Sequence, residues 1–89
     1  MKKVFKITAP EGLHARPCTL LVTAVTPFSS DVQLIYNDKS VNLKSIMGVM
    51  AQGISTGSVV TISASGVDEE ALISKVTEVI TSEGLGVEC

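Results

Sequence analysis

The chain has 89 residues, of which 45% are hydrophobic and 3% aromatic, and its formal charge at pH 7 is −2. This length suits a single domain over residues 1–89, with one mostly aliphatic core and any functional site on the surface. Charges of both signs are mixed along the chain, so there is no basic run of the kind that would predict direct contact with nucleic acid. The longest apolar runs are also too short for membrane insertion. The first residues show a strand pattern rather than that of a signal peptide, so we expect a cytoplasmic protein.

Residues that usually bind metals are few in this chain. It contains two cysteines, Cys18 and Cys89, and one histidine, His14. Neither cysteine belongs to a Cys-x-x-Cys pair, and a zinc site needs more ligands at usable spacing than the sequence offers. Two cysteines, one of them the last residue, also do not make a disulfide framework. We therefore expect no metal site and no cofactor.

The first part of the chain is predicted to form a strand followed by a helix. Apolar and polar residues alternate over 4–8, as in a strand with one buried face. From residue 15 to about residue 26 the apolar spacing is helical instead, and Pro17 lies in the first turn, where its missing N–H costs nothing. The apolar stripe of this helix consists of Cys18, Leu21, Val22 and Val25.

The middle of the chain is predicted to form a hairpin and a short helix. Residues 31–36 and 41–43 are the two strands of the hairpin, and the Asn-Asp-Lys sequence at 37–39 is typical of its turn. A helix follows over residues 46–52, with Ser45 as its N-cap.

The last part is predicted to form a strand and a longer helix. Residues 58–65 alternate again, and a helix then leads from about Asp68 to about Glu83. Gly84 is suited to end this helix. The apolar stripe of the helix consists of Leu72, Ile73, Val76 and Ile80.

These elements follow one another in the order β-α-β-β-α-β-α. Because the strands alternate, their sheet is expected to have one covered and one open face, with the helices on the covered face. We therefore predict an α+β fold, an open-faced two-layer sandwich.

His14 lies where a loop enters the predicted helix of residues 15–26. The first N–H groups of a helix have no partner within it, and the helix dipole adds partial positive charge there, so the position suits a phosphate. A neutral imidazole nitrogen is a nucleophile, and the Arg16 guanidinium matches phosphate oxygens. One interpretation is therefore a histidine that accepts a phosphoryl group. The other is that His14 is an ordinary loop residue and Arg16 a solvated charge, and the spacing alone does not decide between them.

The helix of residues 46–52 carries more apolar side chains than one face can bury. We expect some of them to be exposed, and exposed methionine is common on surfaces that meet several partners. Alternatively, all of them belong to the core. Ser45 is either only a helix cap or a phosphorylation site, at which a phosphate would add charge to a helix N-terminus. The apolar residues in question are Ile46, Met47, Val49 and Met50.

Two neighbours of His14 have more than one possible role. Cys18 lies one helical turn after His14, so the pair could form a thiol nucleophile and its base. The place of Cys18 on the apolar stripe favours the alternative of a small buried residue. Glu11, the nearest carboxylate in sequence, is either a solvated turn residue or a charge that opposes phosphate binding.

Two segments resemble the same known family. Gly-Leu-His-Ala-Arg-Pro at 12–17 resembles the active-site signature of HPr, the histidine-containing phosphocarrier of the bacterial phosphoenolpyruvate:sugar phosphotransferase system. Asn-Leu-Lys-Ser-Ile-Met-Gly-Val-Met at 42–50 resembles the regulatory-serine segment of HPr from Gram-positive bacteria. Residues 61–66 and 82–85 are also similar to that group, so the resemblance covers nearly the whole chain.

The resemblance implies a fold and a role in phosphoryl transfer. The implied fold is an open-faced sandwich of a four-stranded antiparallel sheet with three helices on one face. The protein would be a carrier rather than an enzyme: enzyme I, charged from phosphoenolpyruvate, phosphorylates the family's histidine on Nδ1, and the carrier donates to the IIA domains of sugar permeases. His14 would then be the phosphoryl acceptor and donor, Arg16 the phosphate partner, and Pro17 a residue that sets the helix start.

The resemblance also implies regulation and a docking surface. Ser45 matches the serine that the ATP-dependent HPr kinase/phosphorylase modifies, which slows acceptance from enzyme I and makes the carrier a corepressor for the catabolite-control repressor. A carrier that docks successive partners through one small face is expected to be a monomer. The docking surface would consist of Thr19, Leu20, Ile46, Met47 and Met50.

Some departures from the family pattern bear on these roles. Cys18 stands where the family usually has Ala, and Glu11 stands where many Gram-positive members have Ser. The related regulatory protein Crh keeps the serine but has Gln at the histidine position, so His14 argues against a purely regulatory module that acts through Ser45. Two more hypotheses are a thiol enzyme that uses Cys18 and an α+β interaction domain without phosphate chemistry.

Overall fold

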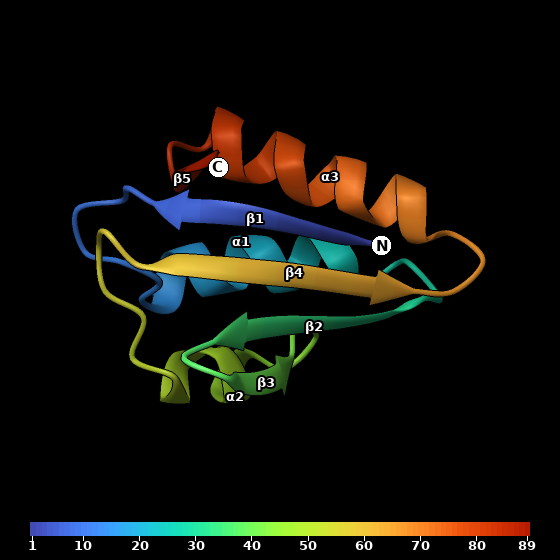
Figure 1. Cartoon of the computed structure of the whole chain (residues 1–89), viewed down its shortest axis with the longest axis horizontal. Coiled ribbons are helices and arrows are strands. Elements are labelled where there is room, and N and C mark those ends of the chain that lie inside the picture. Colours follow the sequence, from blue (N-terminus) through green and yellow to red (C-terminus); the bar gives the residue numbers. More distant parts are fainter.

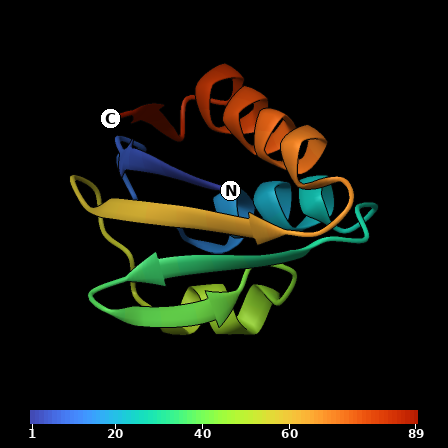
Figure 2. The ribbon, with the colours of Figure 1, turned by 45° about the vertical axis from the view of Figure 1, so that its right-hand side comes forward.

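Five antiparallel strands form the sheet of this protein, and three helices pack against one face of it (Figure 1). The structure is a computed structural model that describes all residues, 1–89. The strand order across the sheet is β3-β2-β4-β1-β5, and Figures 1 and 2 both show α1 behind β4. No helix among the three combines the length and the apolar character needed to cross a lipid bilayer. In chain order the elements are β1 (Lys2–Ile7), α1 (Ala15–Val25), β2 (Asp31–Tyr36), β3 (Lys39–Asn42), α2 (Ile46–Ala51), β4 (Val59–Ser65), α3 (Glu69–Ser82) and β5 (Gly86–Glu88).

The predicted α+β sandwich is confirmed, but the prediction of a four-stranded sheet is wrong by one strand. A fifth strand, β5, pairs antiparallel with β1, with Ile7 opposite Gly86 and Phe5 opposite Glu88. The order of elements is therefore β-α-β-β-α-β-α-β. The three residues of β5 are one buried glycine and two exposed residues, so they show no apolar alternation from which a strand could be predicted. Only the backbone pairing with β1 makes this segment a strand.

Backbone pairing also sets the ends of two other strands. β1 begins at Lys2, earlier than predicted, because that residue already pairs with β4. β3 begins at Lys39, also earlier than predicted, because Asn37 and Asp38 form the whole turn, with φ of 50° and 64°. Two left-handed residues in succession are typical of the tight turn whose twist matches that of the flanking strands.

The predicted apolar faces meet in one core that contains a cluster of 20 buried residues. Alternate residues of the strands, such as Phe5 and Ile7 in β1, are fully buried, while Lys6 between them is exposed. The apolar stripes predicted for the first and last helices are likewise buried, which confirms both of them. One face of the sheet therefore packs against the helices, and the other face is open.

The caps predicted for the helices are also found. At the start of α2, the Ser45 Oγ accepts a hydrogen bond from the Gly48 N–H at 3.1 Å. At the end of α3, Gly84 has a φ of 68°, and the Leu85 N–H reaches back to the Ile80 carbonyl at 2.9 Å. This arrangement satisfies a carbonyl at the helix end and turns the chain toward the sheet edge, where β5 begins.

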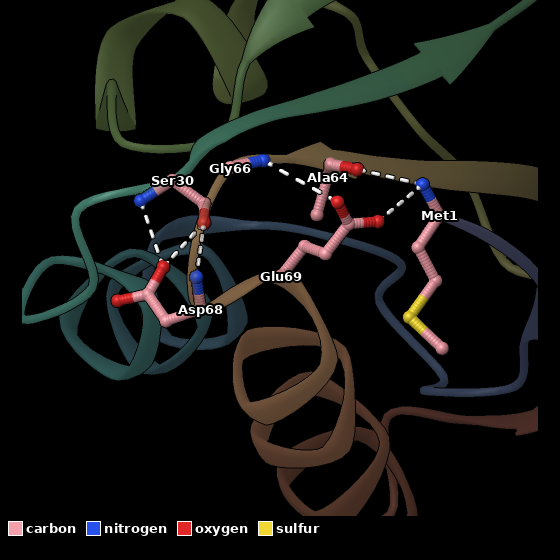
Figure 3. A network of polar contacts seen from close by, with 6 residues as sticks. All are labelled: Met1, Ser30, Ala64, Gly66, Asp68 and Glu69. Carbon is pink, nitrogen blue, oxygen red and sulfur yellow. Dashed lines mark hydrogen bonds and ion pairs between the residues drawn. The ribbon is translucent and has the colours of Figure 1, made fainter.

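A network of hydrogen bonds and an ion pair connects loops at the end of the sheet where the N-terminus lies (Figure 3). The Asp68 carboxylate accepts hydrogen bonds from the backbone N–H groups of Ser29 and Ser30, at 2.9 Å each, and from both serine hydroxyls. These bonds, led by the one from the Ser30 hydroxyl, lower the pKa of Asp68 to about 2. Beside them, a hydrogen bond from the Met1 amino group lowers the pKa of Glu69. The network joins the turn before α3 to the loop before β2.

Candidate functional site

His14 is the N-cap residue of α1, and its side chain is exposed. Its backbone is extended, with φ of −80° and ψ of −165°. The imidazole makes no capping hydrogen bond to the helix that it precedes. The ring is thus presented to the surface rather than used to stabilise the helix start, which leaves it free to react with a group brought by another molecule.

The start of α1 places unpaired donors beside His14. The Cys18 N–H closes the first turn by donating to the His14 carbonyl at 3.0 Å. The N–H groups of Ala15 and Arg16 donate to no carbonyl of the chain, and Pro17 has no N–H to donate. Two unpaired amides at the positive end of a helix dipole favour an anion such as phosphate.

Long-range hydrogen bonds position the loop that carries the histidine. On one side, the Leu13 N–H donates to the Ile54 carbonyl at 3.0 Å. On the other side, the N–H groups of Thr8 and Ala9 donate to the Leu85 carbonyl at 2.9 and 3.1 Å. In Figure 1 the loop after β1, the loop before β4 and the turn before β5 lie together at the left end of the molecule. Two segments that are distant in sequence from this loop therefore hold it in place.

Gly12 is needed where this loop crosses the segment before β4. Its φ is 69°, a conformation that residues with a side chain rarely adopt. A Cβ atom here would collide with the Ile54 carbonyl oxygen and would lie 2.9 Å from the Ser55 Cα. The glycine that opens the 12–17 motif thus allows two backbones to approach, which keeps the histidine at the helix start.

His14 and Arg16 line two adjacent depressions of the surface. The depression at His14 has a volume of about 370 Å³, and the one at Arg16 a volume of about 340 Å³. Pro10 and Glu11 line both, so they form the ridge between the two. Arg16 is exposed and takes part in none of the ion pairs of the structure. The structure therefore places His14 and Arg16 at the same helix start, and the Arg16 guanidinium forms no ion pair there.

Several residues that line these depressions were not singled out from the sequence. Ser55 and Thr56, from the loop before β4, line the depression at His14. Glu83, from the end of α3, lines the depression at Arg16. Their local sequence does not indicate a role beside the histidine, because their place there depends on the packing of distant segments.

The short helix α2 exposes most of its apolar side chains. Val49 is fully buried, whereas Ile46, Met47 and Met50 are exposed by 38%, 83% and 44%. The expectation that some of the four are exposed is confirmed, and the alternative that all belong to the core is wrong. We call Ile46, Met47 and Met50 the apolar patch. Met50 lines the depression at His14, so the patch is continuous with the histidine.

The two remaining predicted docking residues lie on α1. Thr19 is exposed, and its hydroxyl donates to the Ala15 carbonyl at 2.8 Å. Leu20 is half-buried and lines the depression at Arg16. Both residues therefore lie on the surface close to the start of the helix, and Leu20 borders the site directly.

Cys18 is buried, as its place on the apolar stripe predicts. Its side chain is 0% exposed, and its Sγ donates a hydrogen bond to the Leu13 carbonyl at 3.1 Å. Burial raises the pKa of the thiol, which disfavours the thiolate that a nucleophile needs. This arrangement speaks against a thiol enzyme. No group of three or more His, Cys, Asp and Glu side chains is arranged to hold a metal ion.

Comparison with known proteins places this site in a family. A family model described as "PTS HPr component phosphorylation site" matches residues 1–82. The chain belongs to the HPr family. A histidine-containing phosphocarrier protein from Mycoplasma is similar, with 41% identity, a TM-score of 0.94, and coverage of 97% of this chain and 98% of that one. HPr-C-His from Thermoanaerobacter tengcongensis has 42% identity and a TM-score of 0.89, with 93% of each chain covered.

The HPr fold also occurs in a protein of catabolite repression. Crh from Bacillus subtilis has 40% identity to this chain and a TM-score of 0.73, with 86% of this chain and 88% of that one covered. Its structure is described as a domain-swapped, intertwined dimer. Membership of the family therefore connects the chain with the phosphotransferase system, and Crh shows that the same fold also serves catabolite repression.

Proposed function

We propose that this chain is a phosphocarrier that takes a phosphoryl group from phospho-enzyme I onto His14 and donates it to IIA domains of sugar permeases. The observation that carries the proposal is an exposed imidazole at the start of α1, beside two unpaired backbone amides. The family is one of phosphocarriers rather than of catalytic enzymes. We further propose that the chain acts as a monomer, because successive partners can dock on one small face only if that face is free. We also propose that it acts in the cytoplasm.

The transfer step needs only groups that this surface presents. A lone pair on a neutral His14 ring nitrogen, Nδ1 in the family, attacks the phosphorus of the incoming phosphoryl group. A P–N bond forms as the bond between phosphorus and the donor breaks, and its electron pair stays with the donor. The reverse sequence passes the group to an acceptor. The amides of Ala15 and Arg16, which have no partner in the chain, donate to the phosphoryl oxygens.

Arg16 and Pro17 have supporting roles in this proposal. The guanidinium of Arg16 is in no ion pair, so it can turn toward the phosphoryl oxygens when they arrive. Pro17 has its φ restricted to helical values, which pre-sets the backbone where the donors lie. The apolar patch, together with Thr19 and Leu20, forms the docking surface for enzyme I and the IIA domains.

Ser45 is proposed as the site at which HPr kinase/phosphorylase regulates the carrier. Its Oγ accepts the Gly48 N–H bond, so a phosphate there lies at the start of α2, on the helix that carries the apolar patch. The added charge changes the docking surface without unfolding the helix, because an anion is favourable at a helix N-terminus. We expect this charge to slow acceptance from enzyme I and to create a surface that the catabolite-control repressor recognises.

The proposal is tested by incubating the chain with phosphoenolpyruvate and enzyme I. We expect an acid-labile phosphate on the wild-type chain and none on His14→Ala, with Ser45→Ala labelled as well as the wild type. Separately, kinase and ATP should label the wild type and His14→Ala but not Ser45→Ala. A His14→Ala variant that still acquires an acid-labile phosphate would refute the proposed acceptor.

The second candidate function is a purely regulatory role like that of Crh, to which the chain has 40% identity, compared with 41% and 42% to the two phosphocarriers above. It predicts labelling of Ser45 by the kinase and no transfer from enzyme I to any residue. The labelling described above separates the two functions, because only the phosphocarrier accepts a group from enzyme I.

A further inference from the structure

The side chain of Glu11 occupies the ridge between the nucleophile and its counter-charge. It lines both the depression at His14 and the depression at Arg16. The residue is exposed and takes part in no ion pair or side-chain hydrogen bond that would hold its charge elsewhere. A carboxylate without a partner therefore belongs to a residue that borders the place where a phosphoryl group would arrive.

The neighbours of Glu11 restrict the backbone that carries this carboxylate. Pro10 before it has a restricted φ, and the Gly12 N–H after it donates to the Ala9 carbonyl at 2.9 Å. The Leu13 N–H is bonded to the segment before β4. The hydrogen bonds of its neighbours therefore hold the Glu11 backbone at the edge of both depressions, while its side chain is free to move.

Once the site is phosphorylated, negative charges outnumber positive charges among the residues that line it. Arg16 is the cation of the site, while Glu11 and Glu83 are two carboxylates that line the same depression as its guanidinium. A phosphoryl group adds between one and two further negative charges near neutral pH. Like charges at short range raise the free energy of the state in which they coexist.

We infer that Glu11 tunes the transfer potential of the carrier, destabilising the phosphorylated form so that it donates its group more readily. The inference rests on the proposed phosphorylation of His14. Glu11 acts by charge: it repels the phosphoryl oxygens that the Arg16 guanidinium attracts. It neither forms nor breaks a bond in the transfer, so it is a residue that adjusts the equilibrium between donor and carrier.

The size of the change in the phosphorylation equilibrium depends on how strongly water and salt screen the repulsion between the Glu11 carboxylate and the phosphate. At moderate ionic strength the Debye length is about 10 Å, so a carboxylate within the site is only partly screened from the phosphate. We expect Glu11→Gln to shift the equilibrium about three-fold toward the phosphorylated chain. In 1 M salt the Debye length falls to about 3 Å, and the difference should largely disappear.

The test fixes the ratio of phosphoenolpyruvate to pyruvate with a catalytic amount of enzyme I and measures the phosphorylated fraction by intact mass spectrometry. Glu11→Gln should reach half-phosphorylation at a ratio about three-fold lower than the wild type. Glu11→Asp, which keeps the charge, should behave as the wild type does. The matched control is Glu70→Gln, which removes an exposed carboxylate from the first turn of α3, at the opposite end of the sheet (Figure 1). It should leave the midpoint unchanged.

The outcomes separate this inference from the proposed function. If the wild type is phosphorylated and Glu11→Gln has the wild-type midpoint, or needs a higher ratio, the inference is wrong while the phosphocarrier role stands. If Glu70→Gln shifts the midpoint as far as Glu11→Gln, the effect is one of net charge and the assignment to Glu11 fails. If the wild type takes up no phosphate, the proposed function falls and the inference with it.

Discussion

Replacing Gly12 by Ala tests how the loop that carries His14 is held. The new Cβ would collide with the Ile54 carbonyl oxygen and lie 2.9 Å from the Ser55 Cα. The substitution also forces an alanine into a φ of 69°, which costs about 1–2 kcal/mol. Relief of the collision requires the two backbones to separate, which breaks the 3.0 Å hydrogen bond from Leu13 to Ile54 and removes about 1 kcal/mol more.

The total expected for Gly12→Ala is therefore a loss of about 2–3 kcal/mol in the free energy of unfolding. At about 4–8 °C per kcal/mol for a domain of this size, the melting temperature should fall by about 10–20 °C. Urea unfolding followed by circular dichroism measures the first quantity, and a thermal scan measures the second. Phosphoryl acceptance by His14, measured where the variant is still folded, should also slow.

Gly84→Ala is the matched control for this prediction. Its φ of 68° is nearly that of Gly12, but a Cβ there would meet nothing within 4 Å. It should lose only the conformational part, about 1–2 kcal/mol. Equal losses in the two variants would show that the close approach at Gly12 contributes nothing, and the account of how the loop is positioned would be wrong.

Three further predictions follow from other parts of the structure. The hydrogen bonds that lower the pKa of Asp68 from 3.8 to about 2 stabilise the folded chain above pH 4, and this stabilisation is lost as the pH falls through about 2. The wild type should therefore be more stable than Asp68→Asn in urea unfolding at pH 6, with a gap that closes between pH 4 and pH 2; a gap independent of pH would contradict the assignment. In the native state an alkylating reagent should modify the exposed Cys89 and not the buried Cys18, whereas both should react in urea, as counted by mass spectrometry; two labels on the folded chain would contradict the burial of Cys18. Finally, Met47→Ala should change the free energy of unfolding by less than about 0.5 kcal/mol, yet weaken binding to enzyme I in titration calorimetry. Ile62→Ala, in the core, should instead cost about 2–5 kcal/mol, and a Met47→Ala variant that binds as the wild type does would exclude Met47 from the docking surface.

Much of the fold could be predicted from local patterns. The helical stripe that includes Cys18 and the stripe that includes Leu72 are buried as predicted, because a 3.6-residue period leaves only one face able to join a core. The Asn37-Asp38 turn and the caps at Ser45 and Gly84 were predictable for a similar reason. Each depends on the conformational preferences of a few adjacent residues, which act in the same way in any fold.

The edges of the sheet were not predictable in this way. β5 has no apolar alternation, and it is a strand only because β1 presents free backbone groups beside it. The early start of β1 at Lys2 has the same cause, since the pairing with β4 extends past the apolar residues. Backbone hydrogen bonds between strands do not depend on the side-chain pattern, so they cannot be predicted from the local sequence.

For the candidate site, the 12–17 motif is enough to indicate which groups are present, because an imidazole, a guanidinium and the start of a helix lie within a few residues of one another. How these groups are arranged depends on the folded chain. The carbonyls of Ile54 and Leu85 hold the loop from two sides, and Glu11 separates the depressions at His14 and Arg16. The physical reason is that helix ends and side-chain reactivity are local properties, whereas the position of a loop depends on contacts between segments that meet only when the chain has folded.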